Sequence, residues 1–294
     1  MAAVSDDSLG EIESEEELDF KLNSLKEIKC EGLGFIYIGL SDVFLAANRG
    51  RNDIILGLVR YRNVNLDQQT ECGITPLSEA ARMGHTSTVE LLIQLGSRAL
   101  DTPNNFGTTP LAEAAKMGHA SMVKLLIQLG SQSLDTPDNF GMTPMHYACL
   151  GSSVEVLEVL VELGSGALET PDEKGLTPMH MAALSPKYRE MINALIDFGS
   201  CDLNTQDCKG LTPLHFAARH DRGDAVKTFF ELGSKSVNEF THDGSSAISI
   251  AARNNSVSAM TMLIQLGSNL LETPNCYGRP PLDFAGLFFM RRRS

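Results

Sequence analysis

Residues 106–140 read FGTTPLAEAAKMGHASMVKLLIQLGSQSLDTPDNF; an almost identical string precedes them and related strings follow. Each block opens at a glycine, and successive glycines are 34 residues apart, with one spacing of 35 between Gly175 and Gly210. These glycines are Gly39, Gly73, Gly107, Gly141, Gly175, Gly210, Gly244 and Gly278. Self-similarity at such a period predicts a stacked repeat array, which replaces the one or two globular domains that 294 residues would otherwise suggest.

One block predicts two short helices and a turn-rich connection. Thr109-Pro110 begins the first helix, because Thr caps free N–H groups and Pro is tolerated at the first helical position. The pair Gly118-His119 ends that helix, and the apolar positions of 123–129 form a second one closed by Gly130. Two such helices cannot bury their apolar faces alone, whereas stacked copies can.

The motif G-x-T-P-L-H-x-A-A-x-x-G-H, followed by a V-x-x-L-L helix, resembles the ankyrin repeat, most clearly at 141–146 (GMTPMH), 175–180 (GLTPMH) and 210–215 (GLTPLH). The resemblance covers most of the chain, from about Gly39 to the C-terminus. It implies an all-α solenoid, an ankyrin-repeat stack of helix-turn-helix units with short β-hairpin-like loops. Seven full repeats start near 39, 73, 107, 141, 175, 210 and 244, and a partial repeat starts near 278.

The two ends of the chain differ from the array at 39–294. Residues 1–13 are acidic and predicted to be disordered, and 14–38 are predicted to form a capping helix at about 15–30 and an extended segment at 35–38. A mobile, partner-binding helix is the alternative for 15–30. At the other end, 287–290 either caps the core or stays exposed, and 287–294 is either a secretion or localisation signal or merely a cap.

Three full repeats depart from the pattern, two at the start of the first helix and one in its length. The repeat at 39 has Ser41-Asp42, and that at 244 has Ser246-Ala247, where the others have Thr-Pro. The repeat at 175 carries one extra residue, which we place between its helices near Ser185-Pro186.

Composition excludes several classes of function. Eight of the carboxylates lie within residues 1–20, which hold no Lys or Arg, so the net charge of −13 divides into −8 there and −5 elsewhere. No basic stripe is present, and we therefore expect no nucleic-acid partner. No apolar run is long enough to predict a membrane span, and the acidic N-terminus is unlike a signal peptide. The six cysteines form no C-x-x-C pair, which favours reduced thiols in the cytoplasm.

Catalytic and metal-binding chemistry is not indicated. Five of the seven histidines occupy repeat positions, three in Thr-Pro-x-His (His146, His180 and His215) and two after the mid-repeat glycine (His85 and His119). In the family that the motif resembles, the first type makes hydrogen bonds between neighbouring repeats. The recurring acids Asp101, Asp135 and Glu169 lack the spacing of a calcium loop, and we expect them to shape the connections. We expect no enzyme, no cofactor and no metal site.

Partner binding is the function that the resemblance implies, through the hairpin tips and the inner-helix ends. Phe106 and Phe140 are aromatic where the pattern needs none, beside Met83, Met117 and Met142, which predicts an apolar strip over 73–174; each Phe could instead fold onto its own hairpin. A more charged strip is predicted at Lys174, Lys209, Arg219 and Arg253. The full predicted binding set is Met83, Asn105, Phe106, Thr108, Lys116, Met117, Asn139, Phe140, Met142, Leu150, Lys174, Lys209 and Arg219.

We therefore predict a monomeric, non-catalytic protein–protein interaction module, an adaptor or scaffold whose partner the sequence does not identify. The alternative is a targeting or inhibitory subunit that acts on a separate enzyme, including an effector of the kind that intracellular bacteria secrete into the host cytosol. A further hypothesis is that Asn204 resembles the hairpin asparagine that asparaginyl hydroxylases modify in some ankyrin repeats.

Overall fold

The first helix of each repeat begins where the sequence supplies a cap. The Thr75 and Thr109 hydroxyl oxygens accept hydrogen bonds from the backbone N–H three residues on, at 3.1 and 3.3 Å. In the two repeats that lack Thr-Pro, the Ser41 and Ser246 hydroxyls make the same bond at 3.2 and 3.4 Å. Serine therefore preserves the cap, and both departures from the pattern keep the helix start in register.

The computed structural model describes residue 12, residues 14–27 (side chains to 24), 41–200 and 203–268, and residues 274, 278 and 280. Within these ranges α1 (Glu15–Glu27) precedes seven helix pairs. The pairs are α2 (Asp42–Asn48) with α3 (Asn52–Arg62), α4 (Pro76–Met83) with α5 (Thr86–Gln94), α6 (Pro110–Lys116) with α7 (Ala120–Gln128), α8 (Pro144–Gly151) with α9 (Val154–Glu162), α10 (Pro178–Ala182) with α11 (Tyr188–Asp197), α12 (Pro213–Arg219) with α13 (Gly223–Glu231), and α14 (Ala247–Arg253) with α15 (Val257–Gln265). The predicted count of seven full repeats is confirmed.

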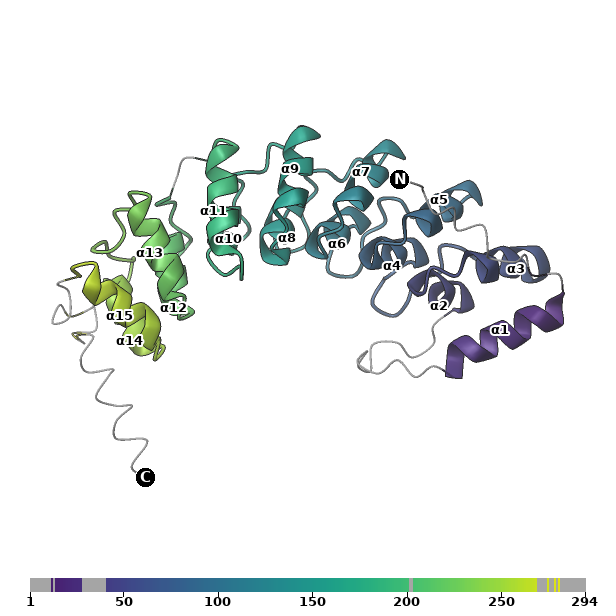
Figure 1. Ribbon diagram of the computed structural model, residues 1–294, viewed down its shortest axis with the longest axis horizontal. Coiled ribbons are helices and arrows are strands. Elements are labelled where there is room, and N and C mark those ends of the chain that lie inside the picture. Colours follow the sequence, from purple (N-terminus) through teal and green to yellow (C-terminus); the bar gives the residue numbers. More distant parts are fainter. Residues whose placement is uncertain are drawn as a thin grey trace, which may run out of the picture. The chain divides into compact units, whose positions relative to one another are not determined.

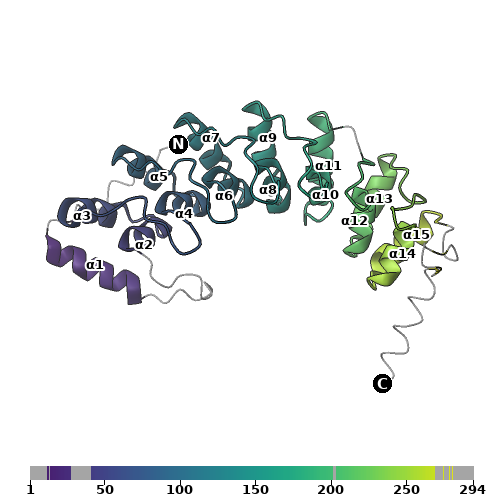
Figure 2. The ribbon, with the colours of Figure 1, turned by 180° about the vertical axis from the view of Figure 1, so that it is seen from behind.

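The chain divides into two units, residues 1–139 and 140–294. In unit 1 the first helices α2, α4 and α6 pack side by side, and α3, α5 and α7 follow one another behind them (Figure 1). In unit 2 the first helices α8, α10, α12 and α14 form one layer, and α9, α11, α13 and α15 form the other (Figure 2). Each unit is thus two layers of helices, with its core between successive repeats.

Small residues bring the first helices close together. Ala80, Ala81, Ala114 and Ala115 have no exposed surface, and α4 packs directly on α6. Behind them the second helices bury leucines such as Leu126, each of which stabilises the fold by about 1.5–3 kcal/mol. The core is mainly aliphatic, and Phe44 and Phe229 are its largest fully buried side chains.

Helix α1 packs against α3 and α2 through Leu18 and Leu22, which are both buried. Its Lys21 Nζ lies 3.3 Å from a carboxylate oxygen of Asp53, a residue of α3 that is almost fully buried. The Arg51 guanidinium donates two hydrogen bonds to the same carboxylate, at 2.9 and 2.7 Å. Lys21 of α1 and Arg51 of the repeat array therefore both contact the buried Asp53 carboxylate.

Ile12, which belongs to the range predicted to be disordered, is buried, and its carbonyl accepts a hydrogen bond from Arg60 Nη1 at 3.2 Å. Most of 1–13, the extended segment at 35–38 and the segment 287–294 lie outside the described residues. No helix in the described ranges is both long and apolar enough to cross a bilayer.

The repeat at 175 differs from the others in its first helix. Helix α10 has five residues, and residues 183–187 connect it to α11, whereas two residues connect α8 to α9. The longer connection is offset by the shorter α10, so the extra residue of this repeat falls in α11, which has ten residues where α9 has nine, and not between the helices as predicted. The connections between repeats are turns, and across the described residues the β-type pairing outside helices is one isolated bridge between Phe240 and Ser246.

Candidate partner-binding surface

Backbone hydrogen bonds join the tip of each repeat to the tip of the next. In each bond the acceptor is the carbonyl of the residue just before a repeat's opening glycine. The donor is the N–H of the residue two positions before the opening glycine of the next repeat. In unit 1 the acceptors are Cys72 and Phe106, at 2.9 Å each; in unit 2 they are Phe140 and Lys174, at 2.9 Å, and Lys209, at 3.0 Å. Because these bonds join main-chain atoms, they fix the backbone of the tips whatever side chains the tips carry.

Glycine is required where the tips meet. Gly107 has φ +82°, and a Cβ there would lie 2.6 Å from the Asn139 nitrogen; Gly175 has φ +79°, and a Cβ there would lie 2.9 Å from the Cys208 nitrogen. A left-handed conformation and a contact of this kind both exclude larger residues. The periodic glycine that defines the repeat is thus the residue that allows neighbouring tips to bond.

The Thr-Pro-x-His histidines connect neighbouring repeats, as predicted. The Thr143 N–H donates to His146 Nδ1 at 3.1 Å, so the ring proton is on Nε2, which donates to the Leu176 carbonyl at 2.9 Å. His180 repeats this arrangement with the Leu211 carbonyl at 3.0 Å. Burial lowers the pKa of His180 and lowers that of His215 to about 4. These rings are buried, neutral and occupied by structural hydrogen bonds.

The mid-repeat histidines have a related role that the sequence did not predict. His85 Nε2 donates to the Asn48 carbonyl at 3.0 Å, and His119 Nε2 donates to the Arg82 carbonyl at 3.1 Å. Each bond ties the end of one repeat's first helix to the turn of the next repeat. In unit 2 the Ser256 hydroxyl does this for the Arg219 carbonyl at 3.2 Å. The only sequence signal was the recurrence of a polar residue after the mid-repeat turn.

The recurring acids also bond between repeats. Asp67 accepts from the Ser97 hydroxyl at 2.5 Å and from the Arg98 N–H at 3.0 Å. Asp101 holds Ser131 in the same way at 2.5 Å. This supports the structural interpretation of the acids over a metal ladder, and the described residues contain no group of three or more His, Cys, Asp or Glu placed to hold a metal ion.

Asn204 occupies the position of these acids in unit 2. Its side-chain oxygen accepts hydrogen bonds from the Ser234 and Ser236 hydroxyls, each at 2.9 Å, and from the Lys235 N–H at 3.1 Å. The side chain is half-buried. Asn204 therefore has a structural role, and its hydroxylation stays a prediction.

In unit 1 the predicted apolar residues lie at the surface. Phe106 is 55% exposed at the hairpin tip, and Met83 and Met117 are exposed at the ends of α4 and α6. Lys116 is exposed beside Met117. Asn105 and Asn139 are also exposed, but their side-chain N–H groups donate to the Glu71 and Asn105 carbonyls at 2.8 and 3.1 Å. The two asparagines thus support the tips, and Phe106, Met83 and Met117 are exposed apolar side chains.

Thr108 is different from the prediction, because it is buried. Its N–H donates to Asn104 Oδ1 at 3.1 Å, and its carbonyl accepts the Asn104 N–H at 3.0 Å. Leu176 and Leu211, which also follow an opening glycine, are buried as well. The chain reverses at the glycine, so the next residue points into the repeat, and we leave Thr108 out of the surface.

In unit 2 the predicted residues form an apolar and a basic group. Phe140 is 50% exposed, Leu150 is exposed at the end of α8, and Met142 is half-buried. Lys174, Lys209 and Arg219 are all exposed. The strip predicted over 73–174 therefore has members in both units, with Met83, Phe106 and Met117 in unit 1 and Phe140, Met142 and Leu150 in unit 2.

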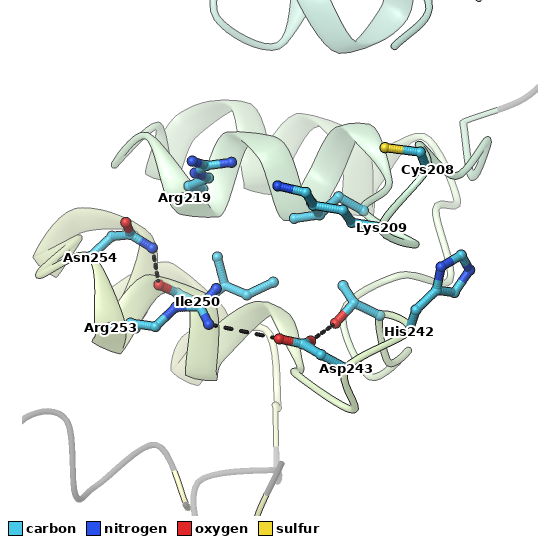
Figure 3. Close-up of a pocket in the computed structure, with 10 residues that line it drawn as sticks. Cys208, Lys209, Arg219, His242, Asp243, Ile250, Arg253 and Asn254 are labelled. Atoms are coloured by element: carbon cyan, nitrogen blue, oxygen red, sulfur yellow. Dashed lines mark hydrogen bonds and ion pairs between the residues drawn. The ribbon is translucent and has the colours of Figure 1, made fainter. Parts of the chain in front are cut away.

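A pocket of about 490 Å³ lies within unit 2, between the repeat at 210 and the repeat at 244. Lys209 and Arg219 come from one side of it, and Asp243, Arg253 and Asn254 come from the other (Figure 3). Leu211 and Ile250 supply its apolar part. The sequence indicated the cations singly, but it did not indicate that they line one pocket.

Fold and surface together define a helix-turn-helix repeat protein with fixed loop tips and variable tip side chains. The family model described as ankyrin repeats (3 copies) matches five overlapping stretches of the chain. They are residues 43–136, 85–170, 130–207, 164–239 and 187–274. The chain belongs to the ankyrin-repeat family, whose repeats are a general protein–protein interaction module.

Two solved structures show the same fold. The human ASB11 ankyrin repeat domain is 24% identical, with a TM-score of 0.63, over 77% of this chain and 97% of that chain. The ankyrin repeat domain of Bcl-3, described as a unique member of the IkappaB protein family, is 30% identical, with a TM-score of 0.56, over 73% of this chain and 95% of that chain. No curated protein sequence matched this chain.

Proposed function

We propose that this chain is a non-catalytic adaptor that binds a partner protein through its hairpin tips and first-helix ends. The observation that carries the proposal is the exposure of Phe106 and Phe140 on tips whose backbones are already fixed by hydrogen bonds. Aromatic residues and Met are typical of interface anchors. Little backbone order is lost when a fixed tip binds, so more of the contact energy contributes to affinity.

The test replaces Phe106 and Phe140 with Ala, singly and together. The wild-type chain is first used to capture a partner from eukaryotic lysate, and mass spectrometry identifies it. Each Phe is about half exposed, so burying that half stabilises the complex by about 1 kcal/mol, and each substitution should weaken binding about fivefold.

Phe230 supplies the matched control. It is 42% exposed on the outer helix α13, away from the tips, and Phe230→Ala should leave the affinity within twofold of wild type, about 0.4 kcal/mol. Circular dichroism reports whether each variant is folded. Unchanged affinity of the folded double variant would remove the tips from the proposed surface.

We propose that the chain acts as a monomer, and size-exclusion chromatography of the captured complex measures its stoichiometry. If the captured partner is an enzyme, its activity with and without this chain separates a scaffold from an inhibitory or targeting subunit. Inhibition that persists in the double variant would contradict binding through the tips.

We place this function in the cytoplasm. Cys72, Cys149 and Cys208 are free thiols, and Cys149 is fully buried in α8. Burial raises the pKa of the Cys149 thiol well above its usual range, so this group is a packing residue and not a reactive one. A chain with unpaired thiols suits a reducing compartment.

A further inference from the structure

The pocket between the repeats at 210 and 244 concentrates positive charge in an acidic protein. Lys209, Arg219 and Arg253 line it with one carboxylate, that of Asp243, so the formal charge of the lining is +2 while the whole chain carries −13. The charge of this pocket is therefore opposite to that of the molecule around it.

Two of these cations have no acidic partner among the residues that the structure describes. No hydrogen bond or ion pair of the Lys209 or Arg219 side chain is found within the described part of the chain, and both residues are exposed. Arg253 Nη1 lies 3.8 Å from Asp243 Oδ2, and both side chains are partly exposed, so this pair is weak. Figure 3 shows Lys209 and Arg219 across the pocket from this pair.

The backbones that carry the two unpaired cations are fixed. The Lys209 N–H donates to Asp207 Oδ1 at 2.8 Å, and its carbonyl accepts the His242 N–H at 3.0 Å. The Arg219 carbonyl accepts the Ser256 hydroxyl at 3.2 Å. Both cations therefore extend from fixed positions into one cavity, which lowers the entropy lost when they bind an anion.

The charged groups that line the pocket indicate which class of anion it can bind. Guanidinium groups bind carboxylates through two parallel hydrogen bonds, and the ammonium group of Lys209 supplies a further charge. Leu211 and Ile250 line the pocket but are almost fully buried, so they add little apolar contact area and the cations dominate its chemistry. Asp243 repels any anion that comes close to it, and two separate carboxylates that each face Lys209 or Arg219 can stay farther from it than one doubly charged phosphate can.

We propose that this pocket binds the carboxylate side chains of an extended acidic segment of the partner protein. The proposal rests on the proposed function and assigns it a partner chemistry. Arg219 and Lys209 are the binding groups, and alternate residues of the segment face them, because successive side chains of an extended chain point to opposite sides.

The experiment uses the full chain and a fluorescein-labelled peptide, GSEVEVEGS, with the neutral peptide GSQVQVQGS for comparison. Fluorescence anisotropy should show that the acidic peptide binds at least about tenfold more tightly, and that the difference shrinks when salt rises from about 50 to about 300 mM. Equal binding of the neutral peptide would overturn the proposal.

Paired substitutions locate the site. We expect affinity for the acidic peptide to fall at least about tenfold in the double variant Lys209→Glu with Arg219→Glu. The uncharged double variant, Lys209→Gln with Arg219→Gln, should lose less affinity. The control pair Lys187→Glu with Lys235→Glu makes the same change in net charge at exposed residues that do not line the pocket, and it should keep wild-type affinity.

An equal loss in the control pair, or wild-type affinity in the pocket variants, would overturn the assignment. Tighter binding of a peptide with phosphoserine at the Glu positions would overturn the choice of carboxylate. None of these results bears on the proposed binding by Phe106 and Phe140, because the variants of those two residues test it separately on the captured partner.

Discussion

Replacing His215 with Asn should reduce the acid sensitivity of the repeat that contains α12. His215 is fully buried; the Thr212 N–H donates to its Nδ1 at 3.4 Å, and its Nε2 donates to the Glu239 carbonyl at 3.3 Å. Protonation would place a charge in this site and remove the acceptor at Nδ1. Burial accordingly lowers the pKa of His215 from 6.5 to about 4.

The sign and size of the effect follow from proton binding. Between pH 6.5 and about 4 an unfolded chain is protonated at His215 and the folded chain is not, so the free energy of unfolding falls as pH falls. A difference of 1 between the two pKa values corresponds to about 1.4 kcal/mol. The wild type should therefore lose roughly 3 kcal/mol through this one residue by pH 4.

Asn lacks the titration but keeps a donor and an acceptor. At neutral pH the variant should be less stable by about 1–2 kcal/mol, because the hydrogen bonds are less well placed. Below pH 6.5 this gap should close and then reverse, since only the wild type loses stability through this group. Burial raises the pKa of Glu113, whose protonation adds stability in acid, but this acts equally in both proteins and cancels in the comparison.

Urea unfolding followed by circular dichroism, at several pH values from 7 down to 4.5, measures the gap. A parallel loss of stability in the two proteins over this range would show that His215 does not stay neutral in the fold while it is protonated in the unfolded chain. Greater acid sensitivity of the variant would mean that the wild-type ring is protonated in the fold.

Two further experiments test how the repeats and α1 are held in place. Gly175→Ala should lower the free energy of unfolding by about 1–3 kcal/mol, because the new Cβ meets the backbone nitrogen of the next tip. The control Gly164→Ala, at φ +88° with open space around it, should lower it only by the roughly 1 kcal/mol of left-handed strain. Equal costs in thermal unfolding would argue against the tip contact. Asp53→Asn should cost about 1–3 kcal/mol and expose α1 to limited proteolysis, because Arg51 and Lys21 lose their shared carboxylate but remain partly in solvent. Unchanged cleavage of α1 would show that this charge does not hold the helix.

The sequence predicted the fold because its signals are local and periodic. Thr-Pro at Thr109-Pro110 and glycines such as Gly107 act within one repeat or between adjacent repeats, so counting along the chain was sufficient. Serine caps at Ser41 and Ser246 kept the register where the motif was lost.

The candidate surface was less predictable because it depends on side-chain direction and on groups from different repeats. Thr108 was assigned to the tip by its place in the motif, but the reversal at Gly107 directs it inward. Arg219 and Arg253 are 34 positions apart, and both line the pocket together with Ile250. The spacing of the two arginines along the chain does not predict that arrangement. The exposure of Phe106 was predictable only as one of two alternatives.

The tip-to-tip bonds separate stability from recognition. Phe106, Phe140, Lys174 and Lys209 occupy the same register position and contribute the same main-chain carbonyl, although their side chains are aromatic in two cases and cationic in two. Substitutions at these positions can therefore accumulate without loss of the tip-to-tip bonds, and under the proposed function each one would change the surface offered to the partner. A repeat of this kind is suited to grafting, since the tip residue of one block can be exchanged for that of another while its neighbours stay as they are.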